Sequence, residues 1–217
     1  MTRTLVLLRH GRTAWNAEGR AQGHTDVPLD EVGRAQAAGV APVIAALAPV
    51  FVRSSDLARA AETAEAVAAA CGLPVVRDVR LREYAVGERA GLTIAEFAAK
   101  FPAAHARWAA AGGSFENADS VAGAESTADV LARMLPSLRS AMSSLAPGET
   151  GVVVGHGAAL RVVLVALLGW DGLAAATLRG LDNCGWATVE DSGTDGGLRL
   201  VAYNRLAPDF ASAGAVG

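Results

Sequence analysis

The chain has 217 residues, a formal net charge of −3 and 52% hydrophobic residues. A hydrophobic fraction of this size is typical of a packed globular protein and excludes a disordered one. The small negative charge indicates no nucleic-acid or membrane partner, and two cysteines, Cys71 and Cys184, are too few for a disulfide framework and lack metal-site spacing.

Short apolar runs alternate with Ala-rich helical segments along the chain. The runs predict strands at residues 4–8, 50–53, 75–76, 151–154, 186–190 and 198–203. Between them, helices are predicted up to about residue 47, up to residue 70, from 126 to 145, and from His156 to about 169. This alternation favours an α/β fold, a three-layer α/β/α sandwich with a mainly parallel sheet covered on both faces.

Capping residues mark the helix ends. Asp30 and Asp56 are predicted to N-cap the first two long helices, and Gly72 ends the second. Residues 91–123 are helical but looser, so we expect an insertion over the site within a single domain spanning residues 1–217. Residues after 210 are expected to fray.

The N-terminal apolar run is interrupted by Arg9, so the chain shows no signal-peptide core, and no apolar stretch reaches bilayer length. We therefore expect a cytoplasmic protein, and leave a homodimer open. Lys100, the only lysine, lies between Ala99 and Phe101, which excludes a P-loop.

The first strand ends on Arg9, His10 and Gly11. Ligands bind at this end of the strands in open α/β sheets. An arginine fork grips phosphate oxygens, and a neutral imidazole can attack phosphorus. An isolated His10 would be interpreted as a strand-end residue bonded to a backbone carbonyl, but its neighbours favour a nucleophile. Thr13 and Asn16 offer polar groups that could hold phosphate oxygens.

A later strand delivers His156 between Gly155 and Gly157 at the start of a helix. The N–H groups and dipole of a helix N-terminus form a cradle for phosphate, so Gly157 is a candidate binding residue. The alternative is a core histidine in a turn. Two strand-His-Gly units in one α/β chain favour the functional interpretation, because parallel neighbours would bring both imidazoles to one edge of the sheet.

Physical reasoning alone does not identify the second phosphate-binding arginine or the acid. Arg59 follows the second strand, but Arg53 is an equal candidate for a second phosphate-binding arginine. An alkoxide leaving group needs an acid, and the water that follows needs a base. Glu83 and Glu88 could each fill that role, and the alternative for Glu88 is a surface ion pair with Arg89.

Together these motifs resemble the histidine phosphatase superfamily, the group related to cofactor-dependent phosphoglycerate mutases. The resemblance rests on Arg-His-Gly-x-Thr-x-Trp-Asn at 9–16, Ser-x-x-x-Arg-Ala at 55–60, Leu-x-Glu…Gly-Glu…Gly-Leu-Thr at 81–93 and Gly-His-Gly at 155–157. It implies that Arg59 is the second phosphate-binding arginine and that Glu83 handles the proton. Gln22 and Gly23 also fit the family pattern and are expected at the site.

Two positions depart from the family pattern. Arg12 stands where Glu or Gln is usual, and Ala124 stands where glycine is common. We expect Arg12 to add positive charge at the mouth of the site. His24 and His105 match no motif and are interpreted as surface residues.

The predicted function is a phosphatase that hydrolyses phosphate monoesters of small metabolites, a sugar phosphate or a phosphoglycerate derivative. His10 would form a phosphohistidine and Glu83 would protonate the leaving oxygen, while Arg9, Arg59 and His156 stabilise the phosphoryl oxygens. No cofactor and no metal are expected, because a cation beside Arg9 and Arg59 would be repelled.

Two alternatives are weighed against this function. Related mutases carry a longer segment between the acid and the second histidine and a tail that shields the phosphohistidine from water. Here the segment between Glu83 and His156 is short and the tail at 207–214 is small, which favours a phosphatase. A dinucleotide-binding oxidoreductase is suggested by Gly155-x-Gly157, but Leu160 stands where the third glycine belongs.

Overall fold

The computed structural model describes every residue except 111, 113–120, 172–177, 192–196 and 209–217. Within the described residues, six strands form one sheet in the order β3-β2-β4-β1-β5-β6. β1 to β4 run parallel, whereas β5 pairs antiparallel with β1 and with β6. The mainly parallel sheet is confirmed. The strands are β1 Thr4–Arg9, β2 Pro49–Ser54, β3 Val75–Arg77, β4 Thr150–Gly155, β5 Trp186–Asp191 and β6 Leu198–Arg205.

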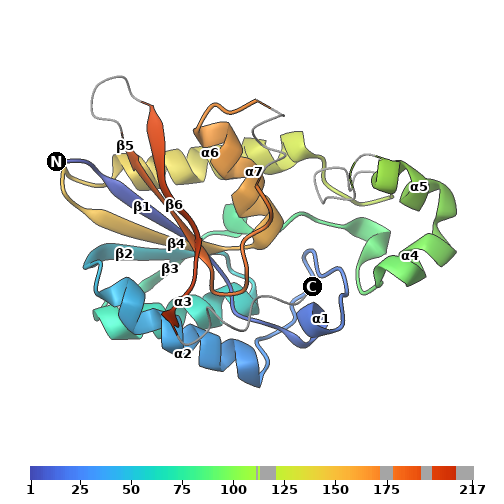
Figure 1. Cartoon of the computed structure of the whole chain (residues 1–217), viewed down its shortest axis with the longest axis horizontal. Helices are drawn as coiled ribbons and strands as arrows, with labels where there is room; N and C mark the ends of the chain where they lie inside the picture. The colour runs from blue at the N-terminus through green and yellow to red at the C-terminus, as the bar shows by residue number, and fades with distance from the viewer. Residues whose placement is uncertain (111, 113–120, 172–177, 192–196, 209–217) are drawn as a thin grey trace.

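Helices cover both faces of the sheet, which confirms the three-layer α/β/α arrangement (Figure 1). α2 and α3 lie on one face, and α6 and α7 lie on the other. Of the helices that the structure describes, none is long and apolar enough to cross a membrane. The helices are α1 Ala14–Ala17, α2 Glu31–Ala45, α3 Ala58–Cys71, α4 Ile94–Lys100, α5 Pro102–Ala110, α6 Thr127–Ser143 and α7 Gly157–Leu167, with 3-10 turns η1 Val79–Leu81 and η2 Gly87–Arg89.

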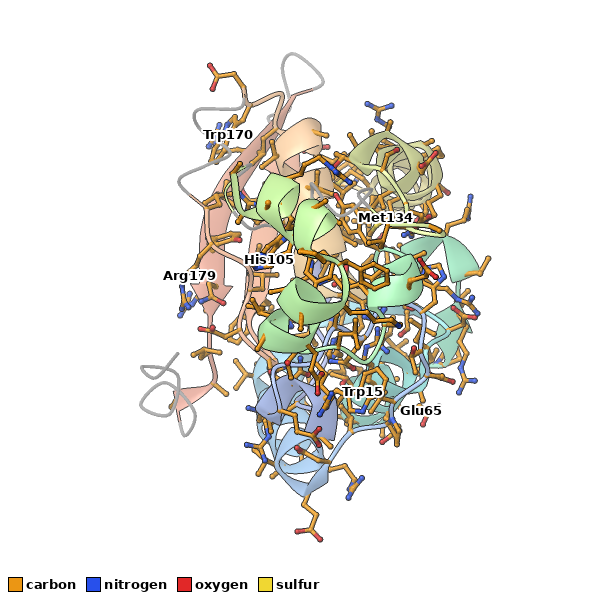
Figure 2. The ribbon with its side chains drawn as sticks, turned by 90° about the vertical axis from the view of Figure 1, so that its right-hand side faces the viewer. Trp15, Glu65, His105, Met134, Trp170 and Arg179 are labelled. Carbon is orange, nitrogen blue, oxygen red and sulfur yellow. The ribbon has the colours of Figure 1, made fainter. Side chains whose placement is uncertain are left out.

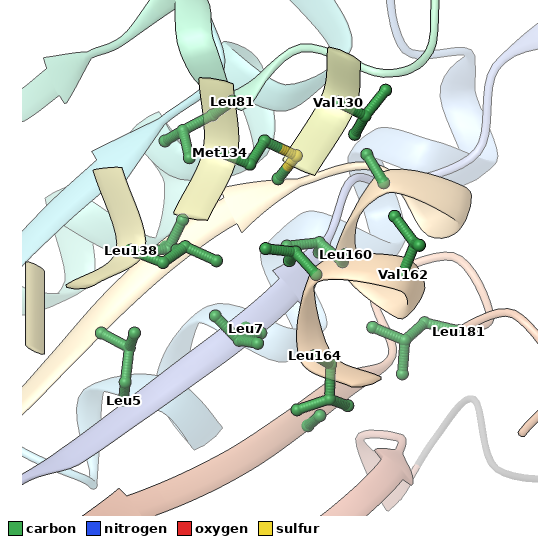
Figure 3. Packing of buried hydrophobic residues seen from close by; sticks show 14 of the residues in the cluster. Leu5, Leu7, Leu81, Val130, Met134, Leu138, Leu160, Val162, Leu164 and Leu181 are labelled. Carbon is green, nitrogen blue, oxygen red and sulfur yellow. The ribbon is translucent and has the colours of Figure 1, made fainter. Parts of the chain in front are cut away.

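The alternation of side chains along β1 divides the core into two clusters. Val6 and Leu8 pack with residues of α2 and α3, while Leu5 and Leu7 pack with residues of α6 and α7. Figure 3 shows Leu7 beneath Leu160 of α7 in the second cluster. Burying each such leucine fully stabilises the fold by about 1.5–3 kcal/mol. The two clusters hold both helical layers against the sheet.

The predicted N-caps differ in outcome. Asp30 caps α2, and its carboxylate accepts the Gly33 N–H at 2.7 Å. The Asp56 prediction is wrong, because α3 begins after Leu57 and Asp56 does not cap it. The Asp56 carboxylate instead accepts two hydrogen bonds from the Arg82 guanidinium, at 2.8 and 2.5 Å. A bidentate charged pair is a stronger interaction than a single cap bond.

α4 and α5 extend beyond one end of the sheet and form a cap (Figure 1). They fall inside the predicted insertion and carry a small apolar cluster of their own, with Phe97, Ala104 and Trp108. The Arg89 guanidinium lies 4.8 Å from the Phe97 ring centroid and 4.6 Å from that of Trp108. Arg89 is thus a buried cap residue rather than a surface partner of Glu88. The predicted fraying after residue 210 lies outside the described residues.

The register of the sheet places the two strand-end histidines side by side. Arg9 at the end of β1 pairs with Gly155 at the end of β4, so the next residues are His10 and His156. The His10 N–H donates to the Gly155 carbonyl at 3.0 Å. β2 ends level with them, because the Ser55 N–H donates to the Val154 carbonyl at 2.9 Å. Three parallel strands therefore deliver their following residues to one edge of the sheet.

Candidate active site

His10 and His156 face each other at this edge, with ring centroids 5.2 Å apart. Both side chains are buried. Burial lowers the pKa of each imidazole well below 6.5, and the cationic Arg59 and Arg9 lower it further. Both rings are therefore neutral at pH 7. A neutral imidazole keeps a lone pair, which a nucleophile requires.

Hydrogen bonding decides which nitrogen of His10 carries that lone pair. Nδ1 lies 2.7 Å from the Gly11 carbonyl oxygen. A carbonyl oxygen can only accept, so Nδ1 carries the proton and Nε2 carries the lone pair. The His10 carbonyl is held in turn by the Cys184 N–H and the Asn183 amide. The side chain and the backbone carbonyl of His10 are therefore both held in place.

The second histidine is oriented by Ser55. Its Nε2 lies 2.9 Å from the Ser55 hydroxyl, which already accepts the Leu57 N–H at 3.3 Å. The hydroxyl can donate its own proton to Nε2 of the neutral ring, and in that arrangement the ring proton lies on Nδ1. Nδ1 of His156 is buried and has no hydrogen-bond partner among the described residues.

Two buried arginines complete the polar environment. Arg59 donates through Nη1 to the Thr25 carbonyl at 2.9 Å and through Nη2 to the Gly23 carbonyl at 2.8 Å. Arg9 donates through Nη1 to the Leu181 carbonyl at 2.5 Å. Burial lowers the pKa of Arg59 to about 10, so it remains a cation at pH 7.

Three buried donors therefore have no partner within the described part of the chain: Nε of Arg9, Nε of Arg59 and Nδ1 of His156. Buried polar groups are almost always hydrogen-bonded, so three unpaired donors gathered beside His10 indicate a site for an acceptor. A phosphoryl group presents several oxygen acceptors at once and carries negative charge. The arrangement can bind and stabilise a phosphoryl group on His10.

The Glu83 side chain lies against the N-terminus of α7. Its carboxylate accepts the N–H groups of Ala158 at 3.2 Å and Ala159 at 2.9 Å. The phosphate cradle predicted at this helix start is thus occupied by the Glu83 carboxylate. Gly157 has a different role, since a Cβ atom there would lie 3.2 Å from Nε of Arg9. Its lack of a side chain leaves room for that guanidinium.

The segment that carries Glu83 is held by Arg133 of α6. The Arg133 guanidinium donates to the carbonyls of Arg80, Arg82 and Glu83 at 2.6–2.8 Å, and it pairs with the Glu125 carboxylate. His24, predicted to be a surface residue, is half-buried, and its Nε2 lies 2.7 Å from the Glu83 carbonyl. These contacts fix the backbone on either side of the candidate acid.

A cavity of about 390 Å³ opens at this edge of the sheet. His156 is fully buried and is not among the lining residues. The lining residues that the sequence singled out are Arg9, His10, Asn16, Gln22, Gly23, Arg59, Glu83 and Gly157. The remaining lining residues, which sequence reasoning missed, are Arg20, Ala158, Arg161, Leu178, Arg179 and Gly180.

Two predicted positions lie elsewhere. Thr13 does not line the cavity; it is fully buried and N-caps α1, and its hydroxyl accepts the Asn16 N–H at 3.1 Å. Arg12 does not line it either, because its Nε pairs with Asp30 at 2.9 Å. Arg12 therefore does not add the expected positive charge at the mouth of the cavity, because its guanidinium is paired with Asp30 at the start of α2. Among the residues described, no group of three or more histidine, cysteine or acidic side chains is arranged to hold a metal ion.

Comparison with known proteins finds relatives over most of the chain. The model of the histidine phosphatase superfamily, branch 1, matches residues 5–205. A glucosyl-3-phosphoglycerate phosphatase of Mycolicibacterium vanbaalenii is 38% identical over 199 residues, which cover 86% of this chain and 84% of the relative. A probable phosphoglycerate mutase of Cronobacter sakazakii is 37% identical over 189 residues, with coverages of 86% and 84%. A solved mycobacterial glucosyl-3-phosphoglycerate phosphatase complexed with VO3 matches with a TM-score of 0.80 and 34% identity, over 93% of this chain and 99% of that chain.

Proposed function

The chain belongs to the histidine phosphatase superfamily, branch 1, and on this premise we propose that it hydrolyses phosphate monoesters of small metabolites through a phosphohistidine on His10. The substrates would be sugar phosphates or phosphoglycerate derivatives. The observation that carries the proposal is the free Nε2 of His10 among three unpaired buried donors. The name of the relative from Mycolicibacterium vanbaalenii supports the substrate class.

In the first half-reaction, Nε2 of His10 attacks phosphorus in line and the bond from phosphorus to the alcohol oxygen breaks. Glu83, carrying a proton at this stage, gives it to the departing oxygen, so the product leaves as a neutral hydroxyl. Nε of Arg9, Nε of Arg59 and Nδ1 of His156 donate to the phosphoryl oxygens as their charge redistributes.

In the second half-reaction, the Glu83 carboxylate takes a proton from water while the water oxygen attacks phosphorus. The N–P bond breaks, inorganic phosphate leaves and His10 regains its lone pair. Glu83 thus ends the cycle protonated, as it began. Because the charge stabilisation comes from two arginines and a histidine, the proposal needs no metal ion and no cofactor.

A mutase is the second candidate, and the relative from Cronobacter sakazakii carries that name. A mutase returns the phosphoryl group from the histidine to a second hydroxyl of its substrate, whereas a phosphatase gives it to water. The short separation between Glu83 and His156 supports the phosphatase. Incubation with 3-phosphoglycerate separates the two: a phosphatase releases inorganic phosphate, and a mutase forms 2-phosphoglycerate.

The nucleophile is tested by trapping. After acid quenching with ³²P-labelled substrate, we expect acid-labile, base-stable label on the wild-type chain and none on His10→Asn. We also expect His10→Asn to lose turnover by at least about 10³-fold, since the covalent route is removed. His105→Asn, in the cap, is the matched control and should label normally. Normal turnover in His10→Asn would refute the assignment.

A further inference from the structure

The loop at residues 22–26 contacts two residues of the proposed reaction that come from different elements. The Arg59 guanidinium donates to the carbonyls of Gly23 and Thr25, at 2.8 and 2.9 Å. His24 stands between these two residues and has no role in the proposed reaction so far. Because its neighbours in the chain bind Arg59, any group that His24 binds is placed relative to Arg59.

His24 binds the backbone of the acid. Its Nε2 lies 2.7 Å from the Glu83 carbonyl oxygen. A carbonyl oxygen can only accept, so Nε2 carries a proton and donates it, in the neutral ring and in the cationic ring alike. The His24 side chain is only 34% exposed, so most of the ring packs against the protein.

The glycine before His24 permits the loop to approach the acid closely. Gly23 has a φ of +54°, in the left-handed region that favours glycine. A Cβ atom at this position would lie 2.6 Å from Cγ2 of Val86 and 3.1 Å from the Tyr84 carbonyl oxygen. The loop therefore packs directly on the segment that follows Glu83.

The end of the loop is fixed to the helix that carries Arg59. Oδ1 of Asp26 accepts the N–H of Ala58, the first residue of α3, at 2.6 Å. A carboxylate is favoured at the N-terminus of a helix, where N–H groups lack partners. Three hydrogen bonds thus join the loop to the start of α3, and the His24 bond joins it to the acid.

An ion pair with Glu125 is the alternative role for His24. Oε2 of Glu125 lies 3.7 Å from Nε2 of His24, which is beyond hydrogen-bond distance. The same carboxylate already pairs with Arg133 at 2.8 Å. Partly exposed ion pairs contribute little, so the shorter bond to the Glu83 carbonyl is the interaction on which a role can rest.

We propose that His24 is a positioning residue, which holds the Glu83 acid in place relative to Arg59 through the hydrogen bond from Nε2. Phosphoryl transfer requires Arg59 at a phosphoryl oxygen and Glu83 at the leaving oxygen in the same geometry, so a shift of one relative to the other slows the chemical step. This inference rests on the proposed function, which supplies the roles of Glu83 and Arg59.

Two substitutions at position 24 separate the hydrogen bond from the charge. Glutamine places its amide nitrogen close to where histidine holds Nε2, whereas asparagine places it nearer the backbone, at the level of Nδ1. We expect His24→Asn to lower kcat for alkyl phosphates by about tenfold or more, with little change in KM, because the contacts to the phosphoryl group remain. His24→Gln, which keeps the donor and lacks the charge, should restore most of that rate.

A double-mutant cycle with Glu83→Gln tests whether the loss passes through the acid. Once the proton donor is absent, its position no longer affects the rate, so His24→Asn should cost less than about twofold in the Glu83→Gln background. An independent structural effect would multiply the two losses instead. His105→Asn is the matched control, since His105 is also half-buried but lies on α5 of the cap (Figure 2), and it should keep the wild-type kcat.

Three results would overturn the positioning role while leaving the phosphatase in place, as long as ³²P is still trapped on the wild-type chain. They are a wild-type kcat in His24→Asn, equal losses in His24→Asn and His24→Gln, and a full multiplied loss in the Glu83→Gln background. If the wild-type protein neither releases phosphate nor forms a phosphohistidine, the proposed function fails and the role of His24 fails with it.

Discussion

We infer that Ser55 acts on the proposed reaction through His156, as a positioning residue. Its hydroxyl lies 2.9 Å from Nε2 of His156. Without this hydroxyl, Nε2 can carry the ring proton, and Nδ1 would then present a lone pair to a negatively charged phosphoryl oxygen. We expect Ser55→Ala to lower kcat by about 10- to 100-fold, in line with the loss of one charge-stabilising donor.

The spectroscopic consequence separates this role from a structural one. ¹⁵N chemical shifts of His156 should move from the Nδ1–H pattern toward the Nε2–H pattern in Ser55→Ala. Ser54→Ala is the control, since Ser54 is equally buried and donates only to the Ser55 carbonyl at 2.8 Å. Unchanged ¹⁵N shifts in Ser55→Ala would contradict the tautomer argument.

Glu83 is expected to matter in proportion to the leaving group. Glu83→Gln cannot donate a proton, so hydrolysis of alkyl phosphates should fall by about 10²- to 10⁴-fold. p-Nitrophenolate is a stable anion and needs little help, so release of nitrophenol in the first turnover should fall much less. The burst of nitrophenol must be measured apart from the steady state, because the proposed mechanism also has Glu83 activate water. Glu88→Gln is the control; if it showed the leaving-group dependence instead, the two carboxylates would have to exchange roles.

Some site residues could be found from sequence and others could not, for a physical reason. Arg9, His10 and His156 can be found from the sequence, because each stands at the end of a buried apolar run. On physical grounds the sequence leaves Arg53 equal to Arg59 and Glu88 a rival of Glu83, and only the resemblance to a family separates them. Ser55 could not be paired with His156, because 101 residues separate them and only the sheet register brings them together.

At the scale of elements, α6 controls the segment that carries the acid. Arg133 holds three consecutive parts of that segment through the carbonyls of Arg80, Arg82 and Glu83. Arg133→Gln removes the charge and most of these donors, so Glu83 should lose its fixed position. We expect hydrolysis of alkyl phosphates to fall by about tenfold or more, and burst release of nitrophenol to fall less, as for Glu83→Gln.

Arg139→Gln provides the control on the same helix, since Arg139 is exposed. It should retain wild-type rates on both substrate classes. Equal losses on alkyl and aryl esters in Arg133→Gln would indicate general damage to the site instead of displacement of the acid. The contribution of Arg133 was invisible in the sequence, because its hydrogen bonds to these carbonyls cross about 50 residues and target backbone atoms.

The ends of strands and helices could be predicted where interactions between neighbouring residues determine them. The strand that was predicted at 4–8 extends to Arg9. The Asp30 cap is present although Arg12 also pairs with that carboxylate, because Arg12 bonds Oδ2 and leaves Oδ1 for the Gly33 N–H at the start of α2. The Asp56 cap failed because Arg82, 26 residues away, binds that carboxylate bidentately. A long-range charged pair thus overrides a local propensity, and no pattern in the neighbouring residues indicates it.

At the scale of the whole molecule, the alternation of strands and helices was sufficient to predict the layers. Each buried strand must cover both of its faces, and the helices between parallel strands supply that cover. The antiparallel β5 and β6 extend the same sheet without interrupting the parallel edge where His10 and His156 meet. The two neutral histidines are thereby enclosed between both apolar layers and two arginines.

This enclosure predicts how stability depends on pH. The folded-state pKa of both His10 and His156 lies well below 6.5, because burial disfavours the charged ring and Arg59 repels it. In the unfolded chain a histidine titrates near pH 6.5. Below that pH the unfolded state binds protons that the native state does not, so the free energy of unfolding falls as the pH falls. The contribution is fully present above about pH 6.5 and is lost by up to about 1.4 kcal/mol per pH unit for each histidine.

Urea unfolding at pH 7.5, 6.5 and 5.5 measures this slope. We expect little change between pH 7.5 and 6.5 from these groups and a clear loss by pH 5.5. His10→Asn removes one of the two buried rings and should reduce the loss by about half, whereas Ser54→Ala should keep the full loss because both rings remain. Equal free energies of unfolding at pH 7.5 and 5.5 in the wild-type protein would show that the rings accept protons in the folded state as readily as in the unfolded chain, and the lowered pKa values of His10 and His156 would then have to be abandoned.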